Sequence, residues 1–104
     1  MSGFLRQILT DQEAGEGVIT LRDGELLGAL HVGPTTANAG NLHVHEDNAN
    51  GREIARIHCN AQYGSVLIGP FEHASKTIYW TVVGTANHGQ LFAWKDADLR
   101  RSQF

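Results

Sequence analysis

The sequence predicts an all-β protein, an antiparallel β-sandwich or jelly roll of about eight strands with a short N-terminal helical arm. Three observations support this class. Short apolar runs recur along the chain between turn-forming residues. Twelve glycines among 104 residues supply the backbone freedom that many tight turns need. Only residues 2–11 show apolar side chains at helical spacing, so a second helix is not expected.

The N-terminal segment is expected to form the helical arm. Its apolar residues recur at a spacing that would gather them on one side of a short helix. These residues are Phe4, Leu5, Ile8 and Leu9. About two turns of isolated helix are unstable in water, so the arm is expected to dock on its own domain or on a neighbouring subunit. A polar linker rich in acidic residues and glycine follows, and arm and linker together span residues 1–16.

The first part of the sandwich contains a hairpin signal. Strands are expected over residues 18–22 and 26–32. The Asp-Gly pair between them is typical of a type I′ turn, because glycine tolerates a left-handed backbone. A loop of small and polar residues follows at 33–40. It is longer than a hairpin needs, so it is expected to cross from one sheet to the other.

The next strand shows the clearest alternation. Residues 41–46 place Leu42 and Val44 on one face and two histidines on the other. An Asn-Gly pair at 50–51 marks another turn, and a strand over residues 52–59 follows it. The two isoleucines of that strand have opposite parity, so a β-bulge or a twisted edge is expected within it.

The C-terminal half supplies most of the aromatic residues. Strands are expected over residues 66–71, 78–83 and 91–95. The middle strand places Trp80 and two aliphatic residues on one face of an extended chain. The other face carries Tyr79, Thr81 and Val83, so both faces of this strand are expected to be partly covered.

Composition limits the classes of protein that this chain can represent. A chain of this length is expected to form one domain, with the sandwich over residues 17–95 and a tail over residues 96–104. The net charge of −3 argues against direct nucleic-acid binding, which needs clustered Lys and Arg. The single cysteine, Cys59, is expected to be a small buried apolar residue. Neither a signal peptide nor a membrane span is expected, so synthesis in a reducing cytoplasm and no membrane partner are predicted.

The most specific chemical feature is the pair His43 and His45. Two histidines at i and i+2 on a strand project from one face and can share a metal ion, as in the cupin barrel. A cupin-like metal-binding protein is therefore one alternative. Two solvent-facing histidines without a metal are the favoured interpretation, and no cofactor is expected. Candidates for a third metal ligand are His31, His58 and His88.

The sequence gives less support for catalysis or for sugar binding. Scattered acidic residues could supply a glycosidase pair, but any acidic β-protein offers such pairs by chance. The chain has no Gly-x-Ser-x-Gly motif and no glycine-rich phosphate loop, so enzymatic activity is not expected. A further alternative is a carbohydrate-binding module that stacks sugars on exposed aromatic rings. The candidate rings are Tyr79, Trp80, Phe92 and Trp94.

The last part of the chain resembles a known group of proteins. The likeness consists of a Gly-Pro-Phe run at 69–71, a strand that ends in Gly-Thr at 84–85, and a final strand that ends at Trp94. This pattern resembles small β-sandwich virion proteins of tailed bacteriophages, of the capsid-decoration or cement type. The resemblance implies a non-enzymatic structural protein, made in the host cytoplasm and located in the virion, that decorates a capsid or belongs to the head–tail machinery.

The two termini are the expected contact segments. Apolar residues on flexible ends are usually buried against a partner, and adjacent basic residues can pair with carboxylates of a neighbour. The expected partners are other copies of the chain, with a trimer as the expected oligomer, and other capsid or virion proteins. The predicted contact residues are Phe4, Leu5, Ile8, Leu9, Arg100, Arg101 and Phe104.

Overall fold

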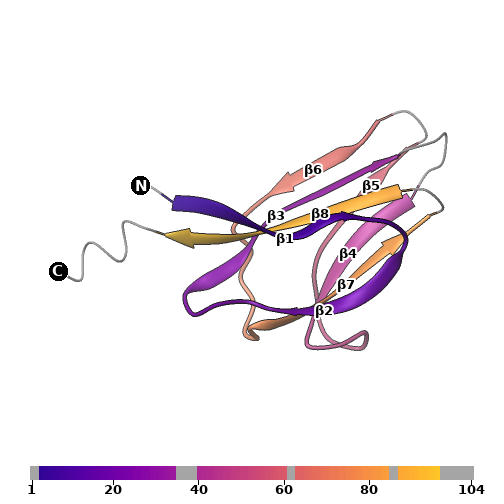
Figure 1. The fold of residues 1–104 in the computed structure, drawn as a ribbon. Helices are drawn as coiled ribbons and strands as arrows, with labels where there is room; N and C mark the ends of the chain where they lie inside the picture. The colour runs from indigo at the N-terminus through magenta and orange to yellow at the C-terminus, as the bar shows by residue number, and fades with distance from the viewer. Residues whose placement is uncertain (1–2, 35–39, 61–62, 85–86, 97–104) are drawn as a thin grey trace.

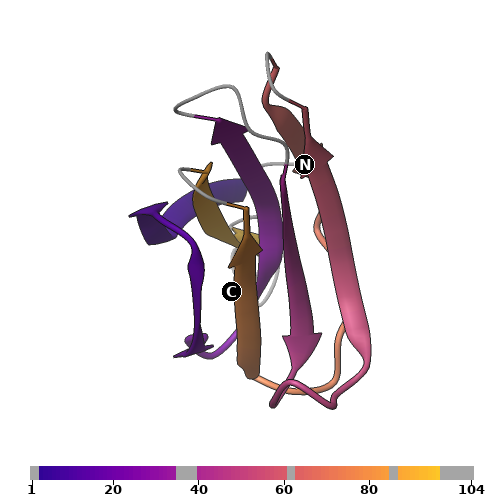
Figure 2. The ribbon, with the colours of Figure 1, turned by 90° about the vertical axis from the view of Figure 1, so that its right-hand side faces the viewer.

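The computed structural model describes residues 3–34, 40–60, 63–84 and 87–96. Within these ranges the chain forms eight β-strands in two four-stranded antiparallel sheets and no helix. The two sheets lie face to face as two layers (Figure 1, Figure 2). This arrangement confirms the predicted all-β class and the β-sandwich. The described part of the chain accordingly has no helix long and apolar enough to cross a membrane.

Each sheet draws strands from both halves of the chain. Sheet A has the order β1-β8-β3-β6, and sheet B has the order β2-β7-β4-β5. Because β3 lies in sheet A and β4 in sheet B, the chain between them crosses between the sheets, as predicted. The strands are β1 (Gly3–Gln12), β2 (Gly15–Thr20), β3 (Glu25–Pro34), β4 (Gly40–Glu46), β5 (Glu53–Cys59), β6 (Ser65–Ile68), β7 (Thr77–Val83) and β8 (Asn87–Asp96).

The predicted N-terminal helical arm is wrong, because this segment forms strand β1. β1 pairs with β8 along its length, and the register is irregular on both sides of Leu9. Ile8 and Leu9 are neighbours in sequence, yet both pack against the core, which explains why the apolar spacing imitates that of a helix. The backbone groups of β8 provide hydrogen-bond partners that no local stretch of sequence reveals.

The predicted hairpin around Asp23 and Gly24 is also wrong. The chain does turn there, and Gly24 has a positive φ of 79°, but Asp23 does not share this left-handed conformation. The flanking strands separate, since β2 pairs with β7 in sheet B and β3 pairs with β8 in sheet A. This turn therefore connects the two layers rather than two hydrogen-bonded strands.

The core lies between the sheets and is built mainly from alternate residues of β3, β4, β5, β7 and β8. Leu42 and Val44 of β4 are fully buried, as predicted. Trp80 and its two aliphatic neighbours on β7 also point inward, and Cys59 is 5% exposed within the apolar cluster. The largest fully buried side chains are Leu27, Leu30, Leu42, Ile78, Leu91, Val32 and Val44.

Strands β4 and β5 form a hairpin around the predicted Asn-Gly turn, and the expected β-bulge is present in it. Val44 pairs with Ala55, but the next residue of β4, His45, pairs with Glu53. Ile54 is therefore the extra residue of β5 at this point. The bulge brings the Glu53 side chain opposite His45, which matters for the outer face of sheet B.

Candidate functional site

The outer face of sheet A carries a continuous set of apolar side chains. Leu5 on β1 pairs with Trp94 on β8. Ala29 on β3 lies between Phe92 on β8 and Ile68 on β6. The β6 side chains are the most open of the set, with Val66 61% and Ile68 72% exposed. We call this surface the apolar face, and its members are Leu5, Ala29, Val66, Ile68, Phe92 and Trp94.

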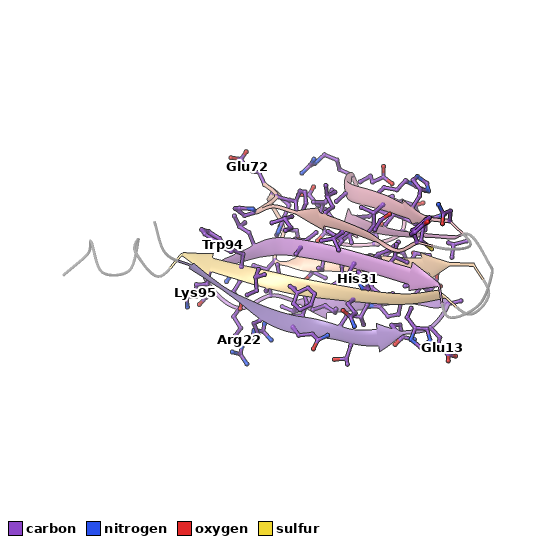
Figure 3. All side chains as sticks on the ribbon, turned by 90° about the horizontal axis from the view of Figure 1, so that it is seen from above. Glu13, Arg22, His31, Glu72, Trp94 and Lys95 are labelled. Atoms are coloured by element: carbon purple, nitrogen blue, oxygen red, sulfur yellow. The ribbon has the colours of Figure 1, made fainter. Side chains whose placement is uncertain are left out.

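A groove of about 310 Å³ lies on the apolar face. Figure 3 shows β1, β8 and β3 side by side, with His31 and Trp94 labelled. Gly28 allows the side chains of Leu5 and Trp94 to pack directly against the backbone of β3. A Cβ atom at this position would lie 2.5 Å from Trp94 Cβ and 2.8 Å from Leu5 Cδ2. The side chains that line the groove carry no formal charge: Leu5, Ala29, Leu30, His31, Val66, Ile68, Gln90 and Phe92.

The outer face of sheet B has a different chemistry, centred on two histidines and one carboxylate. His43 and His45 project outward from β4, since Leu42 and Val44 point inward. Their rings meet edge to face, with centroids 5.1 Å apart. Nδ1 of His43 lies 3.0 Å from Nε2 of His45, and Glu53 Oε1 lies 4.0 Å from the same Nε2 atom. We call His43, His45 and Glu53 the histidine cluster.

Hydrogen bonds assign the protons within the histidine cluster. Nδ1 of His45 lies 2.9 Å from the carbonyl oxygen of Gly51. A carbonyl oxygen only accepts hydrogen bonds, so Nδ1 of His45 carries a proton, and in the neutral imidazole Nε2 then presents its lone pair. The 3.0 Å contact is then a hydrogen bond donated by Nδ1 of His43 to Nε2 of His45.

A cation borders the histidine cluster. The Nε–H group of Arg56 donates a hydrogen bond of 2.7 Å to Glu53 Oε1, and Arg56 pairs with His43 across the β4–β5 register. Partial burial lowers the pKa of His43, the positive charge of Arg56 lowers it further, and Glu53 opposes the shift. Partial burial and the charge of Arg56 therefore favour the neutral form of the His43 ring.

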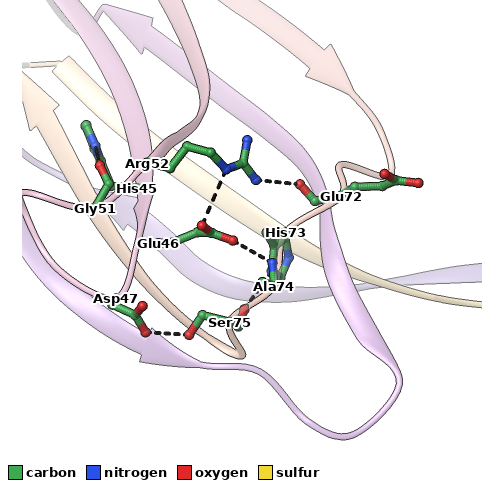
Figure 4. A network of polar contacts seen from close by, with 9 residues as sticks. All are labelled: His45, Glu46, Asp47, Gly51, Arg52, Glu72, His73, Ala74 and Ser75. Carbon is green, nitrogen blue, oxygen red and sulfur yellow. Dashed lines mark hydrogen bonds and ion pairs between the residues drawn. The ribbon is translucent and has the colours of Figure 1, made fainter.

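The neighbouring residue Glu46 serves a structural role. Its carboxylate accepts a hydrogen bond from the Ala74 amide, and its Oε2 lies 3.4 Å from Arg52 Nε (Figure 4). These contacts, the Ala74 amide first, lower the pKa of Glu46. The Ser75 hydroxyl also donates a hydrogen bond to Asp47. The loop before β7 is thus fastened to the β4–β5 turn.

The structure separates the predicted contact and ligand residues. Leu5 lies on the apolar face, whereas Ile8 and Leu9 pack partly against the core. The other predicted contact residues lie outside the described side chains: Phe4, Arg100, Arg101 and Phe104. Within the described residues, His43 and His45 gather with Glu53, whereas the sequence offered other histidines as the third ligand: His31, His58 and His88.

The four candidate sugar-stacking rings do not form one platform. Trp80 is 7% exposed and lies in the core. Tyr79 points outward from sheet B, where its hydroxyl donates a hydrogen bond to Glu16. Phe92 and Trp94 lie on the opposite outer face, that of sheet A. The rings are thus distributed over both outer faces and the core.

Comparisons with known proteins identify no family. No family model and no curated protein matches the sequence. Among solved structures, the chain is similar to a glycoside hydrolase family 43 arabinoxylan arabinofuranohydrolase from Bacillus subtilis, crystallised in complex with cellotetraose. The TM-score is 0.47 and the identity 16%, and the match covers 86% of this chain but only 20% of the hydrolase. A likeness this low carries no functional argument.

Proposed function

We propose that this chain is a non-enzymatic structural protein that assembles with copies of itself through the apolar face. The apolar face is the single observation that carries this proposal. Exposed large apolar residues gathered on one face and bordered by polar residues mark contact surfaces. Leu5, Val66 and Ile68, which are 49%, 61% and 72% exposed, belong to this face.

Charge permits a second copy of the chain as the occupant of the apolar face, although it opposes contacts elsewhere on the surface. Each copy has a net charge of −3, so two copies repel each other through most orientations. The groove on the apolar face is lined by side chains without formal charge. A neighbouring copy can therefore pack against this face without placing a like charge on it, and a heterologous contact of this kind can close into the expected trimer.

The wider setting of the proposal is a phage-like virion. In this setting the chain would be a capsid-decoration or cement protein, or a minor head–tail component, that contacts itself and other virion proteins. The support for this setting is the resemblance of residues 69–94 to small virion proteins of tailed bacteriophages. Genes for capsid or portal proteins beside the gene for this chain would support it further, and neighbours from an unrelated metabolic operon would contradict it.

Substitution on the apolar face tests self-assembly. We expect the wild-type chain to sediment as a closed oligomer, with a trimer as the expected state, and Ile68→Lys to sediment as a monomer. Val18→Lys is the matched control, because Val18 is 57% exposed but lies on β2 in sheet B. A wild-type monomer at high protein concentration would contradict the proposal, as would equal dissociation of both variants.

A further inference from the structure

The histidine cluster combines features that a metal site requires. His43 and His45 are held on one strand by the buried residues Leu42 and Val44, so their backbone positions are set by the core. The β-bulge places Glu53 beside them from the neighbouring strand. One ligand atom from each of the three side chains lies within 4.8 Å of the others.

The two imidazole nitrogen atoms are close to the spacing that a metal imposes. Zinc binds histidine nitrogen at about 2.0–2.1 Å, so two such ligands in a tetrahedral site lie about 3.3 Å apart. Nδ1 of His43 and Nε2 of His45 are 3.0 Å apart and face each other. A small opening of the pair would admit the ion in place of the shared hydrogen. The neutral His43 ring would then carry its proton on Nε2.

The backbone carbonyl of Gly51 orients one ring of the histidine cluster. The Gly51 carbonyl accepts the Nδ1–H group of His45, which is the outer contact that orients histidine ligands in metal sites. Gly51 itself is tightly placed, because a Cβ atom there would lie 1.7 Å from the Glu46 carbonyl oxygen. The Gly51 amide also donates a 2.9 Å hydrogen bond to the Asn48 carbonyl. The His45 ring is therefore oriented with its Nε2 lone pair towards His43 before any metal binds.

Arg56 competes with a metal ion for the carboxylate of Glu53. Its Nε–H group donates a 2.7 Å hydrogen bond to Glu53 Oε1. Both side chains are 40% exposed, so Glu53 can exchange this partner for an ion by rotating its side chain. The positive charge of Arg56 also opposes a second cation nearby. The arrangement predicts moderate metal affinity that rises when Arg56 is neutralised.

We infer that His43, His45 and Glu53 bind one divalent transition-metal ion, with zinc as the best fit. Two imidazole nitrogens and one carboxylate are ligands that suit zinc, and three protein ligands leave a fourth position for water or for a group from another molecule. The site lies on the outer face of sheet B. It is thus independent of the proposed assembly through the apolar face of sheet A.

Zinc titration of the full chain tests the inference, with calorimetry and competition against a chromogenic chelator as readouts. We expect one equivalent of Zn²⁺ to bind to the wild-type chain. His43→Ala and His45→Ala should each weaken binding at least about tenfold, and Glu53→Gln should weaken it by a smaller factor. Arg56→Gln should tighten binding about three- to tenfold at low salt. This gain cannot result from a folding defect.

The controls separate this site from other zinc-binding groups. His58→Ala removes an exposed histidine from β5 and should leave the zinc affinity unchanged. The Ile68→Lys variant should bind zinc like the wild type, whatever its oligomeric state. The inference would be overturned if the wild-type chain bound no stoichiometric zinc, or if the double variant with His43→Ala and His45→Ala still bound it. An Arg56→Gln variant that bound zinc more weakly than the wild type would overturn it as well.

Discussion

A partly buried ion pair joins β1 to the start of β3. Glu25 is 7% exposed and is the one charged residue that the structure buries among those whose burial is described. Arg6 of β1 donates two hydrogen bonds to its carboxylate, from Nε at 2.9 Å and from Nη2 at 2.7 Å. The Arg22 amide donates a third at 2.8 Å. These bonds, with Arg6 first, lower the pKa of Glu25 to about 2 against the opposing effect of burial.

The lowered pKa makes the stability of the fold depend on pH. The pKa of Glu25 falls from 4.5 to about 2 on folding, so the unfolded chain binds more protons between these pH values. Each pKa unit corresponds to about 1.4 kcal/mol, which sets an upper limit of about 3 kcal/mol. The Arg6 side chain is 30% exposed, and solvent screening reduces the contribution to roughly 2–3 kcal/mol. This stability is complete above pH 4.5 and is lost as the pH falls towards 2.

Glu25→Gln is the variant that tests this reasoning. Urea denaturation at neutral pH should show a free energy of unfolding about 2–3 kcal/mol below that of the wild type. The difference should shrink as the pH falls below 4.5 and should nearly vanish by about pH 2. Glu72→Gln is the matched control, because Glu72 is exposed. A difference that stays constant from neutral pH to pH 3, or none at neutral pH, would refute the role of Glu25.

Two further predictions concern packing. Deletion of residues 3–12 should lower the melting temperature by at least about 10 °C, because it exposes the edge of β8 and leaves Glu25 without its cationic partner. An unchanged melting curve would show that the fold does not need β1. Gly17→Ala should cost about 1–3 kcal/mol, because its Cβ would lie 2.8 Å from the Trp80 ring. Gly15→Ala has more room, with its nearest atom at 3.7 Å, and should cost less; equal losses in urea denaturation would argue against the ring contact.

Local patterns predicted the central strands well but not the N-terminal one. The alternation of Leu42 and Val44 with two histidines marks β4 because one of its faces is fully buried. The segment of β1 lacks such alternation, since Ile8 and Leu9 both pack against the core at an irregular register. Its conformation depends on β8, which follows more than 70 residues later in the chain. Pairing at that distance leaves no local signal in the sequence.

The sequence alone predicted only two of the three ligands of the candidate metal site. The spacing of His43 and His45 identifies two ligands, but the third depends on the register between β4 and β5. The Asn-Gly turn at 50–51 indicates a hairpin, and a hairpin places the first residues of β5 opposite the end of β4. That relation could have indicated Glu53. The bulge at Ile54 decides on which side of the sheet the Glu53 carboxylate lies. The position of the bulge is known only once the pairing of β4 with β5 is known.

Strand β1 shows why deletion cannot separate folding from assembly in this protein. Arg6 holds the strand to the core through Glu25, and the preceding residue, Leu5, lies on the apolar face. Removing the segment therefore removes a stabilising pair and a proposed contact residue at once. A polar substitution at Leu5 leaves the Arg6 pair in place, and exposed positions of this kind usually change stability by less than about 0.5 kcal/mol. If assembly uses the apolar face, Leu5→Gln weakens association as Ile68→Lys does, while the melting temperature, compared at a dilution where both chains are monomers, stays near that of the wild type.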